Sequence, residues 1–191
     1  QNGTVEAQGV AKLCTPPSDR LVVGQFGDPG KEGLVEDEQE LGAACIDMGG
    51  GTTSLSIFWK KHMIYADSVW LGGDHITRDI SSALNVPMSK AEWIKTMHGG
   101  VQATGMDDRE MIEIGGETGD WEHDRRTVSR AELIGIMRPR VEEILEEVRA
   151  RLDAAGFEHL PSQRIVLTGG ASQIPGLDGL AVEGDQRPQG L

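Results

Sequence analysis

The stretch Ala43-Ala44-Cys45-Ile46-Asp47-Met48-Gly49-Gly50-Gly51-Thr52-Thr53 decides the fold of this chain. A short apolar run leads into an aspartate, then three glycines and two threonines follow, and apolar and polar residues alternate from there to Trp59. This pattern predicts a strand over 43–47, a glycine turn, and a second strand over 52–59.

The glycine turn has two explanations. Glycine lets a backbone approach a ligand closely, and successive amides in such a turn can form a concavity for a phosphate. Asp47, at the end of the first strand, is then suited to hold Mg²⁺ through water or to position a nucleophilic water. A tight hairpin with no ligand explains the same residues.

Two further strands run into paired glycines. A strand over 62–71 ends at Gly72-Gly73, directly before a helix over 75–84, where free amides and the helix dipole favour an anion. The simpler explanation of this glycine pair is a turn that only joins the strand to the helix. A strand over 164–168 ends at Gly169-Gly170. Because open α/β sheets bind ligands at their strand ends, one sheet could direct all three junctions at one nucleotide.

Length, charge and cysteine content exclude several classes of protein. The 191 residues allow one ordinary domain or two small lobes, and the net charge of -13 argues against general nucleic-acid binding and against unaided attraction to anionic lipid. Two cysteines do not make a disulfide framework, so a reducing cytoplasm is the natural setting. The sequence has no membrane-spanning apolar run, and its five scattered histidines show no zinc spacing.

The remaining pattern predicts the other elements. Three strands joined by short turns form an antiparallel meander. Capping boxes at Ser89–Glu92 and at Ser129–Glu132 predict helix starts, and Pro139 should kink or restart the second helix near Arg138. Two strands are expected over 109–114 and 125–128. Residues 1–33 are loop-rich and stay unassigned apart from a strand at 20–23, and residues 182–191 look like a tail.

Four motifs, in this order and spacing, resemble the actin/Hsp70/sugar-kinase ATPase superfamily, and within it the FtsA family of actin-like bacterial cell-division proteins. The motifs are Cys45–Thr53, Leu71–Thr77, Ala91–Lys95 and Val166–Ser172, and the stretches 107–112 and 128–140 add to the likeness. The resemblance covers about residues 34–181. It implies an α/β fold of the actin-like (ribonuclease H-like) type with a mixed sheet. Residues 34–85 with 164–181 would form the nucleotide-binding subdomain, and 86–163 a smaller α+β lobe.

The resemblance also implies site residues. Asp47 would hold Mg²⁺, through water, or position a water for slow ATP hydrolysis. The implied nucleotide-binding residues are Gly49, Gly50, Gly51, Thr52 and Thr53 of the phosphate turn, Gly72 and Gly73 facing the phosphates, Glu92 and Lys95 reaching the adenosine, and Gly169, Gly170 and Ser172 of the adenosine motif.

The implied cofactors are ATP and Mg²⁺, and the implied partners are the tail of the tubulin-like FtsZ, other division proteins and further copies in actin-like filaments. The implied location is the cytoplasmic face of the inner membrane at the division site. We expect the region 125–151 to grip the FtsZ tail, with Arg138, Arg140 and Arg149 as contacts, unless these arginines only form a solvated face.

Some features of the family are not found in this sequence. They are the first phosphate loop, the inserted division-specific subdomain and a C-terminal amphipathic helix for lipid, so we expect the chain to carry about half of a nucleotide cleft. Trp70 is also bulkier than expected before Gly72-Gly73. Two alternatives stay open, namely an actin-fold small-molecule kinase and a peptide-binding adaptor that does not need nucleotide.

Overall fold

A computed structural model describes residues 21–23, 43–60, 62–105, 107–115, 126–157 and 164–186. Most of the unassigned segment 1–33 and the last five residues of the predicted tail lie outside this part. Among the described residues, no helix combines the length and apolarity needed to cross a membrane.

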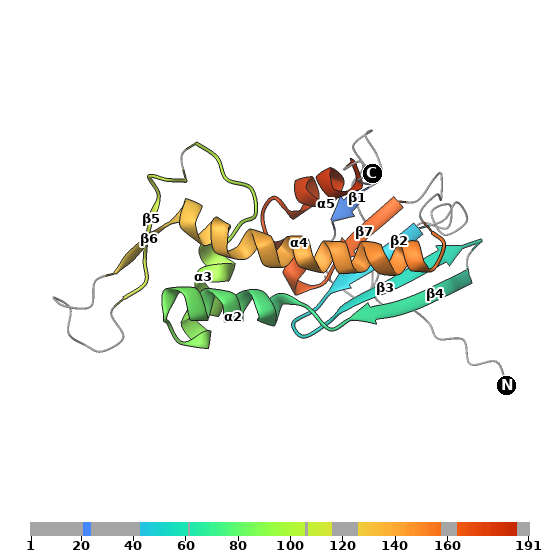
Figure 1. Cartoon of the computed structure of the whole chain (residues 1–191), viewed down its shortest axis with the longest axis horizontal. Helices are drawn as coiled ribbons and strands as arrows, with labels where there is room; N and C mark the ends of the chain where they lie inside the picture. The colour runs from blue at the N-terminus through green and yellow to red at the C-terminus, as the bar shows by residue number, and fades with distance from the viewer. Residues whose placement is uncertain are drawn as a thin grey trace, which may run out of the picture.

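Five strands form a mixed sheet in the order β1-β7-β2-β3-β4 (Figure 1). The strands are β1 (Leu21–Val23), β2 (Ala43–Met48), β3 (Thr53–Trp59), β4 (His62–Val69) and β7 (Arg164–Thr168). β2, β3 and β4 pair antiparallel, whereas β7 runs parallel to both β1 and β2. The predicted mixed sheet with an antiparallel meander is therefore confirmed.

One face of this sheet carries the core. Leu55 and Ile57 of β3 are buried, whereas Ser54 before them is exposed and Ser56 between them is half-buried, as the alternation along the strand predicts. Helices α4 (Arg130–Ala154) and α5 (Leu177–Gln186) cover this face. α5 follows a short 3-10 helix, η1 (Gly170–Gln173), and its length shows that residues 182–186, predicted as tail, are helical.

Two helices follow β4. α2 (Gly73–Leu84) begins immediately after the second glycine junction and buries Ile76, Ile80 and Leu84 on one stripe. α3 (Met88–His98) begins one residue before the predicted capping box, and its N-cap is Pro87. Ser89 is therefore the second residue of the helix and the predicted capping box is wrong, because the chain turns helical one residue earlier and no side chain caps it.

α4 runs without interruption through Pro139, so the predicted restart of the helix near Arg138 is wrong. Proline crowds the carbonyl four residues earlier, and that residue is Gly135, which is exposed and has no side chain. Buried Met137 and Val141 on either side of the proline hold both halves of the helix to one core. The predicted cap is confirmed, because Ser129 Oγ accepts a hydrogen bond of 3.2 Å from Glu132 N.

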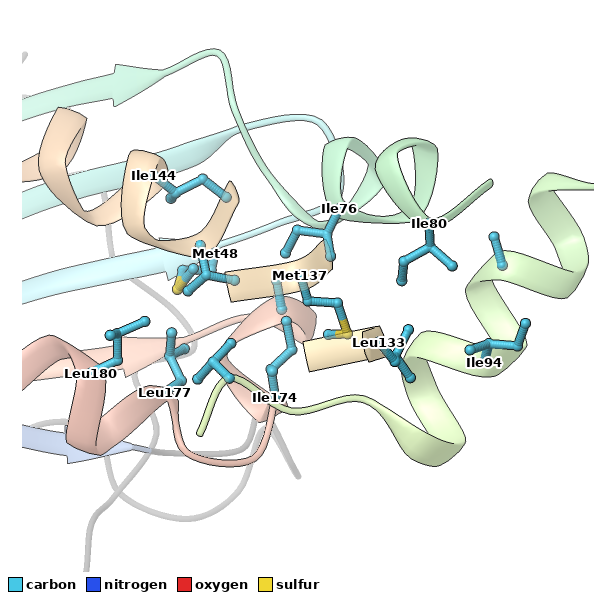
Figure 2. Close-up of a cluster of buried hydrophobic side chains, with 14 of the residues drawn as sticks. Met48, Ile76, Ile80, Ile94, Leu133, Met137, Ile144, Ile174, Leu177 and Leu180 are labelled. Carbon is cyan, nitrogen blue, oxygen red and sulfur yellow. The ribbon is translucent and has the colours of Figure 1, made fainter. Parts of the chain in front are cut away.

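The smaller lobe shares the core of the sheet. Its strands β5 (Met111–Glu113) and β6 (Thr127–Ser129) pair antiparallel and are shorter than predicted or shifted. Ile112 and Val128 belong to the same buried cluster as Leu55 of the sheet. Side chains from β2, α2, α3, α4 and the α5 region meet around Met137 (Figure 2). α4 thus packs against both the sheet and the strands of the predicted smaller lobe, along one continuous core.

Candidate nucleotide-binding site

The fold brings the three glycine junctions together at one edge of the sheet. Gly73 N donates to Gly49 O and Asp74 N donates to Gly50 O, both at 2.9 Å. The third junction joins them because β7 is parallel to β2, which pairs Thr168 with Asp47 at the strand ends. The predicted convergence of the three junctions is confirmed as geometry.

The close approach of the first two junctions requires glycine at residue 72. A Cβ atom at this position would lie 2.6 Å from Gly49 O and would overlap Gly50 O. Thr53 also holds the first junction to the second, since its buried Oγ1 donates a hydrogen bond to Leu71 O, directly before Gly72, at 2.8 Å. Trp70 fits at the adjacent position because its side chain is exposed.

The expectation of free amides at the start of α2 is wrong. The amides of Gly73, Asp74 and His75 donate to the carbonyls of Gly49, Gly50 and Gly72. An anion at this helix end would find these donors already used. The β2–β3 turn instead supplies donors: no described residue accepts a hydrogen bond from the amides of Gly50, Gly51 or Thr52.

Two further features of this sheet edge are compatible with a bound ligand, namely open space beside the glycine backbones and a buried hydroxyl without a hydrogen-bond partner. A Cβ on Gly51 or on Gly170 would meet no atom within 4 Å, so both backbones face open space. Thr168 Oγ1 is buried and has no hydrogen-bond partner among the described residues. A buried polar group without a partner is costly, and a polar ligand at this edge is one way to satisfy it.

Two acidic side chains lie at this edge. Asp47 is half-buried, and the exposed Asp74 approaches the turn, since a Cβ on Gly50 would lie 3.0 Å from Asp74 Oδ1. Burial, and then the charge of Asp47, raise the pKa of the Cys45 thiol to about 11. Among the described residues, no group of three or more His, Cys, Asp or Glu side chains could hold a metal ion. Mg²⁺ usually keeps several waters and takes one or two carboxylates together with substrate phosphates, so the Asp47 carboxylate at this edge fits that ion in type.

Lys95 and Glu92 of α3 meet around a residue that sequence reasoning missed, Thr77 of α2. Lys95 Nζ lies 2.8 Å from Thr77 Oγ1, 3.1 Å from Gly73 O and 2.7 Å from Glu92 Oε2. Thr77 Oγ1 lies 2.5 Å from Glu92 Oε2 and 3.0 Å from Gly73 O. Burial raises the pKa of Glu92, but the hydrogen bonds from Lys95 and Thr77 outweigh it, so the net pKa is lowered from 4.5.

This network ties α3 to the first turn of α2, next to the glycine junctions. Thr77 is buried, and its single hydroxyl proton serves Glu92 or Gly73 while its oxygen accepts from Lys95. From periodicity alone, Thr77 belongs to the buried stripe of α2. Only the folded structure shows which groups surround its hydroxyl.

We predict that Thr77→Val lowers the free energy of unfolding by about 1–3 kcal/mol, because it removes a buried hydrogen bond to charged groups at nearly constant volume. Urea denaturation of the variant measures the change. Thr96→Val is the matched control, since Thr96 Oγ1 is exposed and bonds only to Glu92 O. Equal losses in the two variants would contradict a role for the Thr77 network.

The predicted adenosine motif, Gly169-Gly170 with Ser172, forms a tight turn closed by a side-chain hydrogen bond. Ser172 is buried and its Oγ donates to Gly169 O at 2.7 Å, which closes η1 on the third glycine junction. Gly73 approaches the same element, since a Cβ at this position would lie 3.3 Å from Ala171 Cβ. The structure therefore places the predicted adenosine residues beside the predicted phosphate residues.

The three predicted partner-binding arginines already have ion pairs. Arg138 pairs with Glu142 at 2.9 Å, and Arg149 lies 3.9 Å from Asp153. Arg140 contacts both carboxylate oxygens of Asp79 in α2, at 2.6 and 3.1 Å. Arg140 thus helps to fasten α4 to α2, while the other two pairs lie along α4 itself.

Asp107 braces the start of α4 in the smaller lobe. The N–H of Thr104 donates to Asp107 and lowers its pKa from 3.8. Burial opposes this lowering, and the Thr104 hydroxyl and Arg130 add to it. Arg130 Nη1 lies 3.5 Å from Asp107 Oδ1 and 3.3 Å from Glu110 Oε2.

We predict that this carboxylate makes stability fall in acid. A lowered pKa means that the folded state prefers the charged form, so the contribution is complete above the ordinary pKa of 3.8 and is lost as the pH falls through the lower folded value. Unfolding of the wild type and of Asp107→Asn at pH 7 and pH 3 measures it. The variant should be less stable at pH 7 and the difference should be smaller at pH 3, and a constant difference would contradict the assignment.

Solved structures define the class of fold. MreB 5 of Spiroplasma citri bound to AMPPNP matches with a TM-score of 0.61 at 20% identity, over 88% of this chain and 61% of that chain. A PilM-PilN type IV pilus biogenesis complex matches with a TM-score of 0.56 at 19% identity, over 78% of this chain and 35% of that chain. With the mixed sheet and the three strand-end glycine junctions, these likenesses define an actin-like ATPase fold.

Sequence relatives identify the family within this class. The family model for cell division protein FtsA matches residues 44–184. The FtsA of Agrobacterium fabrum is 42% identical over 169 residues, covering 87% of this chain and 38% of that protein. The FtsA of Pseudomonas aeruginosa is 37% identical over 182 residues, covering 95% of this chain and 43% of that protein. The chain belongs to the FtsA family and spans about two fifths of the length of these relatives.

Proposed function

We propose that this chain supplies one wall of an ATP-binding cleft in an FtsA-type cell-division protein. The observation that carries the proposal is the meeting of the three glycine junctions at one sheet edge, with Gly49 and Gly50 bonded to the start of α2. The open amides of the β2–β3 turn would bind phosphates, and Asp47 would hold Mg²⁺ through water. In support, the solved MreB 5 structures carry ADP or AMPPNP.

The isolated chain should bind ATP weakly or not at all, because a nucleotide cleft of this fold needs a second wall. Isothermal titration of ATP and Mg²⁺ into the chain tests this expectation. Micromolar affinity would contradict it. If such binding is found, Asp47→Ala should abolish it under the proposal, whereas binding unchanged by the substitution would place nucleotide elsewhere.

We also propose that the smaller lobe and α4 bind the FtsZ tail, an acidic and apolar segment. Arg138 and Arg149 lie about three helical turns apart and therefore share one side of α4. Arg140 lies on the other side and is held by Asp79. A peptide along α4 can then meet Arg138 and Arg149, whereas Arg140 acts on the fold.

Titration of an FtsZ C-terminal peptide into the chain, with and without ATP, tests this second part. Arg138→Ala should weaken binding about fivefold or more, as expected for loss of a charged contact to a carboxylate. Arg151→Ala is the matched control on the same helix, since Arg151 pairs with Asp67 of β4 at 3.0 Å. Absence of binding in every case would remove the FtsZ assignment and leave the nucleotide proposal to its own test.

The proposal has a third part. The protein would self-associate into actin-like filaments and would interact with other division proteins at the inner membrane. Membership of the FtsA family supports this part of the proposal, since the matching family model is described as cell division protein. ATP hydrolysis, if it occurs in the complete protein, would be slow, and the residue in this chain suited to position water is Asp47.

A further inference from the structure

The tip of the β3–β4 hairpin exposes apolar side chains in an unusual number. Trp59 is 40% exposed, Met63 51% and Ile64 49%. Single exposed apolar residues are ordinary on a protein surface, but a group of large ones at one place marks an interaction site. These three residues and Lys60, called the hairpin tip below, take no part in the nucleotide site.

The hairpin tip is also cationic in an acidic chain. None of the 31 acids lies between Asp47 and Asp67, although the net charge is -13. Lys60 sits at a φ of 49°, in the left-handed region that favours glycine or asparagine in a hairpin turn. A lysine therefore stands where turn geometry favours another residue, and no described residue forms an ion pair with it.

The edge strand itself is poorly shaped for pairing with another strand. β4 is the last strand of the sheet, and its register with β3 shifts between Ile57 and Phe58. Such a bulge bends an edge and hinders the addition of a further strand. Contact through the side chains of the hairpin tip is therefore favoured over strand addition.

An apolar groove lies on the covered face of the sheet, between α4 and α5. Leu145, Val148 and Leu152 of α4 line it together with Leu167 and Leu180, and Glu142, Glu146 and Arg149 lie along it. Its volume of about 170 Å³ is below the range of small-molecule sites, roughly 300–1,000 Å³, but suits one or two large apolar side chains. Glu146 is exposed and has no ion pair among the described residues.

We propose that the hairpin tip of one copy of this chain docks into the α4–α5 groove of a second copy. The tip is apolar and carries Lys60, whereas the groove is apolar and carries two glutamates against one arginine, so size and net charge are complementary. Lys60 would face Glu146 of the second copy. Because the two surfaces differ, each added copy leaves one tip and one groove free, which gives an open chain of copies. The inference deepens the proposed self-assembly by naming its surfaces, and it does not require nucleotide.

Charge exchange tests the proposal in the full 191-residue chain. Sedimentation velocity over a concentration series measures self-association of the wild type, Lys60→Glu, Glu146→Lys and the double variant. Each single reversal should weaken association about tenfold, and the double variant should recover to within about threefold, as close charge pairs across interfaces do. Arg78→Glu, an exposed reversal on α2, is the matched control and should change nothing.

Lys60→Asn separates association from folding. It removes the charge and relieves the backbone, so the melting temperature should rise while association weakens. A fall in both would mean that the hairpin was damaged. In that case the result of the Glu146→Lys variant, which leaves the hairpin intact, decides the proposal.

Disulfide trapping identifies the surfaces directly. Lys60→Cys and Glu146→Cys are placed in two copies with tags of different size, in a Cys14→Ser background, while the other cysteine, Cys45, is buried. Oxidation of the mixed copies should yield the cross-linked heterodimer.

Three results would overturn the proposal: a wild type that stays monomeric at every concentration, the absence of a mixed cross-link, or a double variant that associates as weakly as the single variants. Binding of the tip to anionic vesicles without self-association would also overturn it. FtsZ-peptide binding would survive each of these failures, which separates them from failure of the proposed function.

Discussion

Replacing Gly169 with alanine is expected to lower the free energy of unfolding by at least about 3 kcal/mol. Gly169 has φ of 88° and ψ of 168°, a region that only glycine occupies readily, and forcing another residue there costs about 1–3 kcal/mol. An added Cβ would also overlap Asp47 Oδ1 and Met48 O. The strand ends of β2 and β7 would have to separate, and both belong to the centre of the sheet.

Gly170→Ala is the matched control for that substitution. It adds the same methyl group one residue later, where a Cβ would meet no atom within 4 Å and the residue is exposed. Its effect should stay within about 0.5 kcal/mol. Urea denaturation followed by far-UV circular dichroism measures both variants. Similar losses at the two positions would show that the third junction does not need the close approach of β2 and β7.

Met137→Ala should cost about 2–5 kcal/mol, because it removes a fully buried side chain from the centre of the core. Met137 lies in α4 among residues from β2, α2 and η1–α5 (Figure 2). Met97→Ala in α3 is the control, since Met97 is 61% exposed and its loss should change stability by less than about 0.5 kcal/mol. Thermal or urea unfolding measures the difference.

The same substitution tests whether the two lobes unfold together. One buried cluster contains Ile112 and Val128 of the smaller lobe as well as Leu55 of the sheet. Tryptophan fluorescence and far-UV circular dichroism should therefore report a single coincident transition in the wild type and in Met137→Ala. Two separated transitions would mean that residues 86–163 form a lobe with a stability of its own.

Local pattern was enough to predict most of the elements. The alternation in β3 and the helical spacing of Ile76, Ile80 and Leu84 are properties of a few consecutive residues, so they appear before the chain folds. The prediction failed where neighbours override local preference. Pro139 was expected to break α4, but an exposed Gly135 and a core on both sides of the proline keep the helix continuous.

The candidate site could be predicted as a set of residues but not as a set of contacts. Spacing indicated that Gly49, Gly72 and Gly169 end three strands, and parallel pairing of β2 with β7 brings them together. Thr77 was missed, because a threonine on an apolar helical stripe shows nothing of Lys95 and Glu92, which approach it from another helix.

The sequence by itself determined the meander, the glycine junctions and the resemblance to the FtsA family, because these depend on periodicity and spacing along the chain. Only the tertiary structure decided which backbone donors remain for a ligand. The amides at the start of α2 looked free in sequence, yet the carbonyls of Gly49 and Gly50 take them, and the donors of the β2–β3 turn remain. Hydrogen bonds between distant segments depend on how strands and helices pack, and no local pattern encodes that packing.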